Sequence, residues 1–127
     1  MKYLLDTHVL IWLLNGDNVL SKNVLEIIKN PKLELFVSII SFWEVSIKRS
    51  LGKLDISYST RDLINETKNS GIKIISVEPN HIFSLEELSL HHRDPFDRLI
   101  VAQSKAENML LISKDEIFDK YITSRIW

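Results

Sequence analysis

The stretch YLLDTHVLIWLLNG, residues 3–16, decides the fold class of this 127-residue chain. Its first three residues form a short apolar run compatible with a β-strand, and a helical pattern follows over residues 8–15. Gly16 stands where a helix needs a left-handed closing residue. Asp6 lies at the junction between the two patterns. The stretch therefore predicts a buried strand that leads directly into a helix, with a carboxylate between them.

The same alternation continues along the rest of the chain. Apolar runs predict strands at Tyr3–Leu5, Leu35–Ile39, Ile72–Val77 and Met109–Ile112. Helical patterns occupy residues 8–15, 21–29, 41–51, 60–70, 79–88 and 95–107. Strands that alternate with helices indicate an α/β fold with a parallel sheet, and unbroken apolar strands indicate burial on both faces of that sheet.

Length and composition set limits on the kind of protein. The length suits one domain over residues 1–127, and 45% apolar with 26% charged residues is typical of a globular protein. The absence of cysteine excludes disulfides, thiolate zinc sites and cysteine nucleophiles. The net charge of −1 gives no general attraction for nucleic acid, so any RNA contact needs a local patch or a groove formed by two copies.

The N-terminal region resembles a signal peptide only superficially. Asp6 and His8 interrupt its apolar run, and no small-residue cleavage site follows. The run Val9–Leu14 is far shorter than the roughly 20 residues that a membrane span needs. We therefore expect a cytoplasmic protein whose N-terminus belongs to the core.

Five acidic residues fall at the predicted ends of strands or the starts of helices. Asp6 and Asp115 each follow a strand, and Glu44 lies one turn into the helix after the second strand. Asp94 and Asp97 begin the helix of residues 95–107. Strand carboxyl ends and the helix starts that follow them meet at one edge of a parallel sheet, where open α/β sheets bind ligands. These carboxylates are therefore expected to converge.

Convergence of several carboxylates has an energetic consequence. Two unit charges about 4 Å apart repel by roughly 4 kcal/mol at an effective dielectric constant near 20. The acids must then take up protons, separate or bind a cation. Carboxylate oxygens in a site open to water suit Mg²⁺ or Mn²⁺, ions that activate water and neutralise charge during phosphodiester hydrolysis.

Each acid also has a structural interpretation. Asp94 can cap a helix that has Pro95 in its first turn. The segment from Ser41 to Glu44 reads as a capping box, and Asp6, Thr7 and Asp115 can cap helices as well. Two considerations favour a metal site: an unpaired charge after an apolar strand is costly, and caps have no reason to share one sheet edge.

Other polar and aromatic residues near the acids carry weaker signals. His8 is expected to be partly buried beside the site, and His91 and His92 are interpreted as a solvated loop rather than as metal ligands. Trp12, Phe42 and Trp43 are expected in the core or an interface rather than as a base-stacking surface. Candidate phosphate contacts are Lys48, Arg49, Lys53, Arg93 and Arg98.

Several segments resemble the PIN-domain family, and most closely its VapC-like toxin branch. The segments are LLDTHVLIWLL (4–14), SIISFWEVSIKRSLGKL (38–54) and HRDPFDRLIVAQSKAENMLLISKDEIFDKY (92–121). The resemblance implies a three-layer α/β/α fold with a central, mainly parallel sheet. It also implies an Mg²⁺- or Mn²⁺-dependent ribonuclease, a homodimer and a cognate antitoxin that blocks the site.

The resemblance assigns roles to individual residues. The acids of the family's nuclease site fall on Asp6, Glu44, Asp97 and Asp115, and Asp94 matches the DPFD pattern of this branch. On this basis Asp6, Glu44 and Asp97 hold one ion, and Asp115 holds a second ion or orients the attacking water. Thr7 matches the hydroxyl residue after the first acid, and Arg98 is a candidate substrate contact.

Two other functions are compatible with acids at strand ends. A phosphoryl-transfer domain of the phosphatase type needs a DxD motif, which Asp6–Thr7–His8 lacks. A receiver needs an acidic pair after the first strand and a lysine after the last, and neither is clear, although Lys114 stands beside Asp115. A non-catalytic binding module would use the acids only as helix caps, and its melting temperature would not respond to Mg²⁺ or Mn²⁺.

Overall fold

The computed structural model describes residues 1–54, 56–91, 93–121 and 125–127. Its strands are β1 (Lys2–Leu5), β2 (Glu34–Ser38), β3 (Lys73–Ile75), β4 (Leu110–Ile112) and β5 (Arg125–Ile126). Its helices are α1 (Thr7–Asn15), α2 (Lys22–Lys29), α3 (Ile39–Ser50), α4 (Thr60–Asn69), α5 (Pro79–Glu86) and α6 (Pro95–Ala106), followed by the short 3₁₀ helix η1 (Glu116–Lys120).

The strands form one parallel sheet in the order β3-β2-β1-β4-β5. Leu4 of β1 stands opposite both Phe36 of β2 and Leu111 of β4, so β1 lies in the middle. The chain builds outward from β1 through β2 to β3, and then returns to the other side of β1 with β4. This reversal creates a topological switch point between β1 and β4, where open α/β sheets bind ligands.

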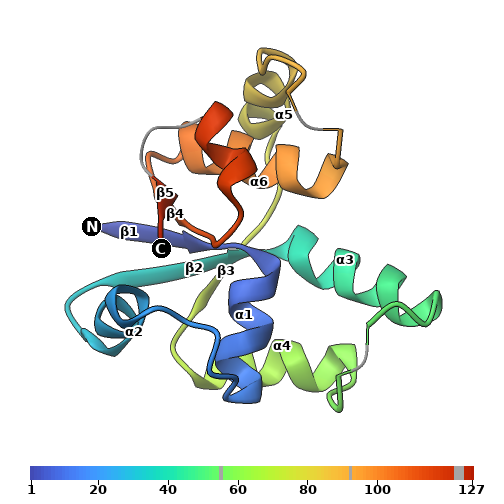
Figure 1. The fold of residues 1–127 in the computed structure, drawn as a ribbon. Helices are drawn as coiled ribbons and strands as arrows, with labels where there is room; N and C mark the ends of the chain where they lie inside the picture. Colours follow the sequence, from blue (N-terminus) through green and yellow to red (C-terminus); the bar gives the residue numbers. More distant parts are fainter. Residues whose placement is uncertain (55, 92, 122–124) are drawn as a thin grey trace.

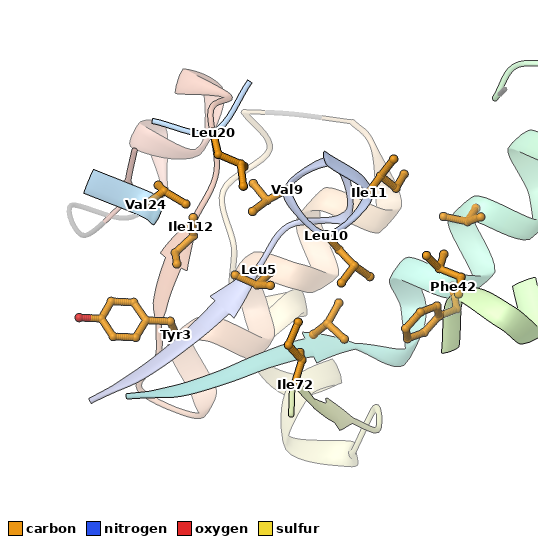
Figure 2. Close-up of a cluster of buried hydrophobic side chains, with 13 residues drawn as sticks. Tyr3, Leu5, Val9, Leu10, Ile11, Leu20, Val24, Phe42, Ile72 and Ile112 are labelled. Atoms are coloured by element: carbon orange, nitrogen blue, oxygen red, sulfur yellow. The ribbon is translucent and has the colours of Figure 1, made fainter. Parts of the chain in front are cut away.

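Helices cover both faces of the sheet, which makes the fold a three-layer α/β/α arrangement. In Figure 1, α5 and α6 lie on one face and α1, α2 and α4 on the other. Neighbouring residues of a strand point to opposite faces, so Leu4 joins the core under α6 while Leu5 joins the core under α1. Figure 2 shows Leu5, Ile112 and Ile72 in this second core together with Val9 and Leu10 of α1.

The predicted elements are present, with shifts at their ends. Gly16 closes α1 with a φ of 71°, as expected. The second strand ends at Ser38 rather than Ile39, and the Ser38 hydroxyl accepts a hydrogen bond from the Ile40 amide at 3.2 Å. The expected capping box from Ser41 to Glu44 was therefore wrong, because the helix has already begun two residues before Ser41. Strand β5 was not predicted.

No helix in the described part of the chain is both long enough and apolar enough to cross a bilayer.

Candidate active site

A cleft of about 330 Å³ opens at the switch point of the sheet. All five predicted acids line it, together with two lysines, a histidine and a tryptophan: Asp6, Glu44, Asp94, Asp97, Asp115, Lys48, Lys114, His8 and Trp12. The acids come from the end of β1, from α3, from the start of α6 and from the end of β4. Segments far apart in the sequence thus place their carboxylates around one space, as the predicted topology required.

Asp6 is buried at the end of β1 and is fully engaged by hydrogen bonds. Its Oδ1 accepts from the backbone amides of His8 at 2.7 Å and Val9 at 3.3 Å, and so caps α1. Its Oδ2 accepts from the Ser113 hydroxyl at 2.5 Å. Burial raises the pKa of Asp6 above its ordinary value, although the hydrogen bond from Ser113 and the nearby His8 act in the opposite direction.

Glu44 is the one acid of the cleft on a helix interior, and it is 2% exposed. Its Oε2 accepts a hydrogen bond from the Lys48 ammonium at 2.7 Å, one turn further along α3. Its Oε1 is buried and has no hydrogen-bond partner. Such an oxygen is costly in a folded protein and calls for an explanation, such as an absent ion or water.

Several of the acids influence the pKa of Lys48. Burial disfavours its charge, but the hydrogen bond to Glu44 and the nearby carboxylates of Glu44, Asp94 and Asp97 outweigh burial and raise the pKa of Lys48. The lysine therefore carries a positive charge inside the acidic cleft.

Asp94 and Asp97 occupy the start of α6. The Asp94 carboxylate accepts a hydrogen bond from the Asp97 amide at 3.0 Å and caps the helix, and Pro95 takes the first helical position, as predicted. Asp97 lies in the first turn and is half-buried. The positive end of the helix dipole favours negative charge at this position.

Asp115 is exposed beyond β4 and caps η1 by accepting from the Ile117 amide at 3.0 Å. Ser113, which holds Asp6, also accepts a hydrogen bond from the Asp115 amide at 3.1 Å. The serine thus links the acid after β1 to the loop after β4. Lys114 lies between Ser113 and Asp115 in the sequence and is exposed at the rim of the cleft.

Three of the other predicted contacts, Thr7, Arg98 and Arg49, have hydrogen-bond partners within the protein. Thr7 is buried and donates to the Ser41 hydroxyl at 2.8 Å, which joins α1 to α3. One guanidinium nitrogen of Arg98 donates to the Ser89 carbonyl at 3.0 Å and to the Tyr121 hydroxyl at 3.2 Å. Arg49 donates to the carbonyls of Ile56 and Tyr58.

The histidines and aromatic residues differ in part from expectation. His8 is exposed at the cleft, not partly buried. Phe42 is in the core, whereas Trp43 is 61% exposed and contacts Phe96 with ring centroids 5.2 Å apart. His91 is exposed, and the prediction for His92 lies outside the described residues.

The cleft is more open than a tight carboxylate cluster. Within the described part of the chain, no three acidic or histidine side chains stand close enough together to hold a metal ion as they are placed. Mg²⁺, however, keeps several waters and is commonly bound through one or two carboxylates. A buried carboxylate oxygen without a partner, beside further carboxylates around a space open to water, fits such a hard divalent cation.

Ser113 and Trp12 were not predicted as parts of the site. The role of Ser113 depends on β4 lying beside β1, which the sequence alone does not show. Trp12 lines the cleft and packs against His8 and Trp127, with ring centroids 5.9 Å from each. Its spacing of four residues from His8 on one helix was the available signal.

Several solved structures share this fold, and one of them is a toxin–antitoxin complex from Klebsiella pneumoniae. A chain of the VapBC2 complex of Rickettsia felis, bound to a promoter DNA fragment, has 20% identity and a TM-score of 0.67, over 95% of this chain and 93% of that one. A chain of VapBC-1 from nontypeable Haemophilus influenzae has 20% identity and a TM-score of 0.70, over 94% and 92%. At this identity the likeness shows the fold alone.

Sequence comparison identifies the family. A search of curated protein sequences found no match. The sequence model of the PIN domain, however, matches residues 3–122, nearly the whole chain. This match agrees with the three-layer fold and with the acids gathered at the switch point. The chain belongs to the PIN-domain family, a family of nucleases.

Proposed function

We propose that this protein is a metal-dependent endoribonuclease that hydrolyses RNA phosphodiester bonds, and that it is the toxin component of a toxin–antitoxin pair. One observation carries the proposal. Carboxylates from four segments line one cleft at the switch point of a PIN fold, and one of them, Glu44, has a buried oxygen without a partner. A divalent cation would supply the positive charge that this acidic arrangement lacks, and it would attract the negatively charged phosphodiester of the substrate.

Different acids of the cleft are proposed to bind different metal ions. We propose that Asp6, Glu44 and Asp97, with Asp94 beside them, would hold an Mg²⁺ or Mn²⁺ ion in part through its water ligands, and that Asp115 would hold a second ion or orient the attacking water. When bound, the ion supplies positive charge to the phosphate and activates water. Ser113 and the first amides of α1 keep the Asp6 carboxylate fixed before any ligand arrives. Such preorganisation of charged groups is a large source of catalytic power.

Helix capping accounts for only part of this site. Asp6, Asp94 and Asp115 each accept a hydrogen bond from a backbone amide at a helix start, as the binding-module interpretation requires. Glu44 does not, because it lies five residues beyond the start of α3 and contacts Lys48 instead. A protein that needed its acids only as caps would have no use for a buried glutamate here.

The proposed partners follow from the likeness to toxin–antitoxin complexes. Structures from Rickettsia felis, Haemophilus influenzae and Klebsiella pneumoniae that share this fold are all complexes of that kind. We propose that a cognate antitoxin covers the cleft, that the protein is a homodimer in the cytoplasm, and that the whole chain is a single PIN domain.

The substitution Asp97→Asn tests the function. It keeps the shape of the side chain and removes the charge, so the variant is expected to fold normally and to lose cleavage of RNA in the presence of Mg²⁺. Asp62→Asn is the matched control, because Asp62 is also a first-turn acid but lies on α4, outside the cleft. Undiminished cleavage by Asp97→Asn would eliminate the assignment. Labelling of the protein by acetyl phosphate would instead support a phosphoryl-transfer domain.

A further inference from the structure

Lys48 occupies an unusual position for a lysine. Its ammonium lies in the cleft, 2.7 Å from Glu44 Oε2, and about one third of its side chain is exposed. Asp94 and Asp97 also act on its charge from the start of α6. The cleft therefore already contains a cation that belongs to the chain, at the oxygen atoms where a bound metal ion would be expected.

The helix itself sets this contact. Glu44 and Lys48 are four residues apart on α3, so their side chains extend along the same face, and a glutamate that precedes a lysine by four residues is the favourable order. The Glu44 side chain is only 3% exposed, which makes an unpaired charge there costly. Lys48 therefore contributes to folding as long as nothing else neutralises Glu44.

We propose that Lys48 is a built-in counterion that neutralises Glu44 when no metal ion is bound and thereby weakens the binding of a divalent cation. This inference rests on the proposed function, because it concerns the same cleft. A cation that approaches Glu44 meets repulsion from Lys48, and it must share the carboxylate with Lys48 or displace it. The cleft then fills only at a cation concentration higher than its carboxylates alone would require.

Lys114 supplies an internal comparison. It lines the same cleft but is exposed at the rim, and Glu44 takes its hydrogen bond from Lys48. Removal of the Lys114 charge should raise the cation affinity only through the general charge of the cleft. Removal of Lys48 should act through that general charge and, in addition, release Glu44 Oε2.

The test is a calorimetric titration of the metal-free protein with MnCl₂ at constant ionic strength, without RNA. The variant Lys48→Met keeps the aliphatic stem and removes the charge. We expect its dissociation constant to fall at least about fivefold, since even in bulk water unit charges 4 Å apart interact by that factor. The Mn²⁺ affinity of Lys114→Met should lie between that of wild type and that of Lys48→Met. Lys73→Met removes a lysine from an exposed pair with Glu34 outside the cleft and should leave the affinity unchanged.

Melting temperature gives a second, independent readout. Metal-free Lys48→Met should melt below wild type, because Glu44 loses its partner, and Mn²⁺ should raise its melting temperature by more than that of wild type. Lys48→Arg keeps the charge and should resemble wild type in both measurements. Lys48→Gln, which keeps a hydrogen-bond donor but not the charge, replaces Lys48→Met in the same titration if Lys48→Met does not fold.

The possible results separate this inference from the proposed function. Unchanged or weaker Mn²⁺ binding by a folded, uncharged Lys48 variant, while wild type binds, overturns the role of Lys48 and leaves the nuclease proposal intact. An equal gain in Lys114→Met also overturns it, because the effect would then come from the general charge. A titration in which neither wild type nor Lys48→Met binds Mn²⁺ rejects both. A gain in Mn²⁺ affinity that is larger in the uncharged Lys48 variants than in Lys114→Met supports the inference whether or not RNA is cleaved.

Discussion

Two buried polar groups of this protein each contain an oxygen without a hydrogen-bond partner, and they differ in what surrounds it. The first is Glu44 Oε1 in the acidic cleft, and the second is Gln103 Oε1 between α5 and α6; these are the two such side-chain atoms among the described residues. The first belongs to a charged carboxylate beside an open cleft, and the second to a neutral amide in a closed contact between helices.

The group around Gln103 is satisfied apart from that oxygen. The amide nitrogen of Gln103 donates to the Ser76 carbonyl at 3.2 Å. His81 is buried, and its Nδ1 accepts from the Glu78 amide at 2.9 Å, so the ring proton belongs on Nε2, which lies 2.7 Å from the Glu107 carboxylate. This network joins α5 to α6, and none of these residues lines the acidic cleft.

The comparison shows that a functional site is distinguished by the charge of the buried group and by a neighbouring cleft that a ligand can enter. A missing hydrogen bond alone does not distinguish it. An unsatisfied amide oxygen costs about 1–3 kcal/mol, which a domain of this size tolerates. A buried carboxylate costs more unless a cation neutralises it. Lys48 donates a hydrogen bond to Oε2 of Glu44, whereas Oε1 has no partner. A bound metal ion would supply one. We therefore propose that the first group serves the nuclease site and that the second is structural.

The largest expected effect separates the two groups by activity. Glu44→Gln should lower the rate of RNA cleavage about a hundredfold or more, because it removes the charge that would hold the metal ion. Gln103→Met, which removes the amide and keeps the volume, should leave the cleavage rate per folded molecule unchanged. Initial rates in Mg²⁺, normalised to folded protein, check this prediction. Equal losses in both variants would erase the distinction.

The next effect separates them by stability. His81→Leu should lower the free energy of unfolding by about 2–4 kcal/mol, because the Glu78 amide and the Gln103 side chain lose a buried partner. The exposed His91, replaced by leucine as a control, should change it by about 0.5 kcal/mol or less. Denaturant unfolding measures both values. A loss of cleavage in folded His81→Leu would show that the network also serves the site.

The smallest effect concerns pH. The hydrogen bond from His81 lowers the pKa of Glu107 below its ordinary value of 4.5. A carboxylate with a lowered folded-state pKa contributes stability above its unfolded pKa and loses it as the pH falls through the folded value. Wild type should therefore exceed Glu107→Gln in stability at pH 7 by about 1 kcal/mol or less, since Glu107 is 38% exposed and screened by solvent.

Melting curves of the two proteins between pH 7 and pH 3 measure this contribution. The difference between them should shrink as the pH falls below 4.5. A difference that stayed constant with pH would mean that the hydrogen bond, and not the charge of Glu107, matters.

The sequence predicted most of the fold, because its signals are local. Apolar runs and helix stop residues located four strands and six helices, and Pro95 and Gly16 marked helix ends correctly. The start of α3 was misplaced because Ser38 and Ser41 are both plausible caps, and the choice depends on where β2 stops pairing with its neighbours. Strand β5 has two residues, too few for a periodic pattern.

The candidate site was predictable as a set of acids but not as a set of contacts. The position of each acid after a strand or at a helix start placed it at the correct edge of the sheet. The hydrogen bond between Asp6 and Ser113 joins residues 107 positions apart. It could be predicted only if the strand order were already known. Lys48 was expected to contact phosphate, and its four-residue spacing from Glu44 was a local signal that pointed to the observed pair.

The most direct test of the metal site is the melting temperature of wild type and Glu44→Gln with and without Mn²⁺. An ion that binds only the folded state stabilises it by linkage, by about 2.7 kcal/mol at a concentration 100 times the dissociation constant. The cleft described above predicts a clear rise for wild type and a much smaller one for Glu44→Gln. No rise in wild type, or an equal rise in both proteins, would contradict a metal site built around Glu44.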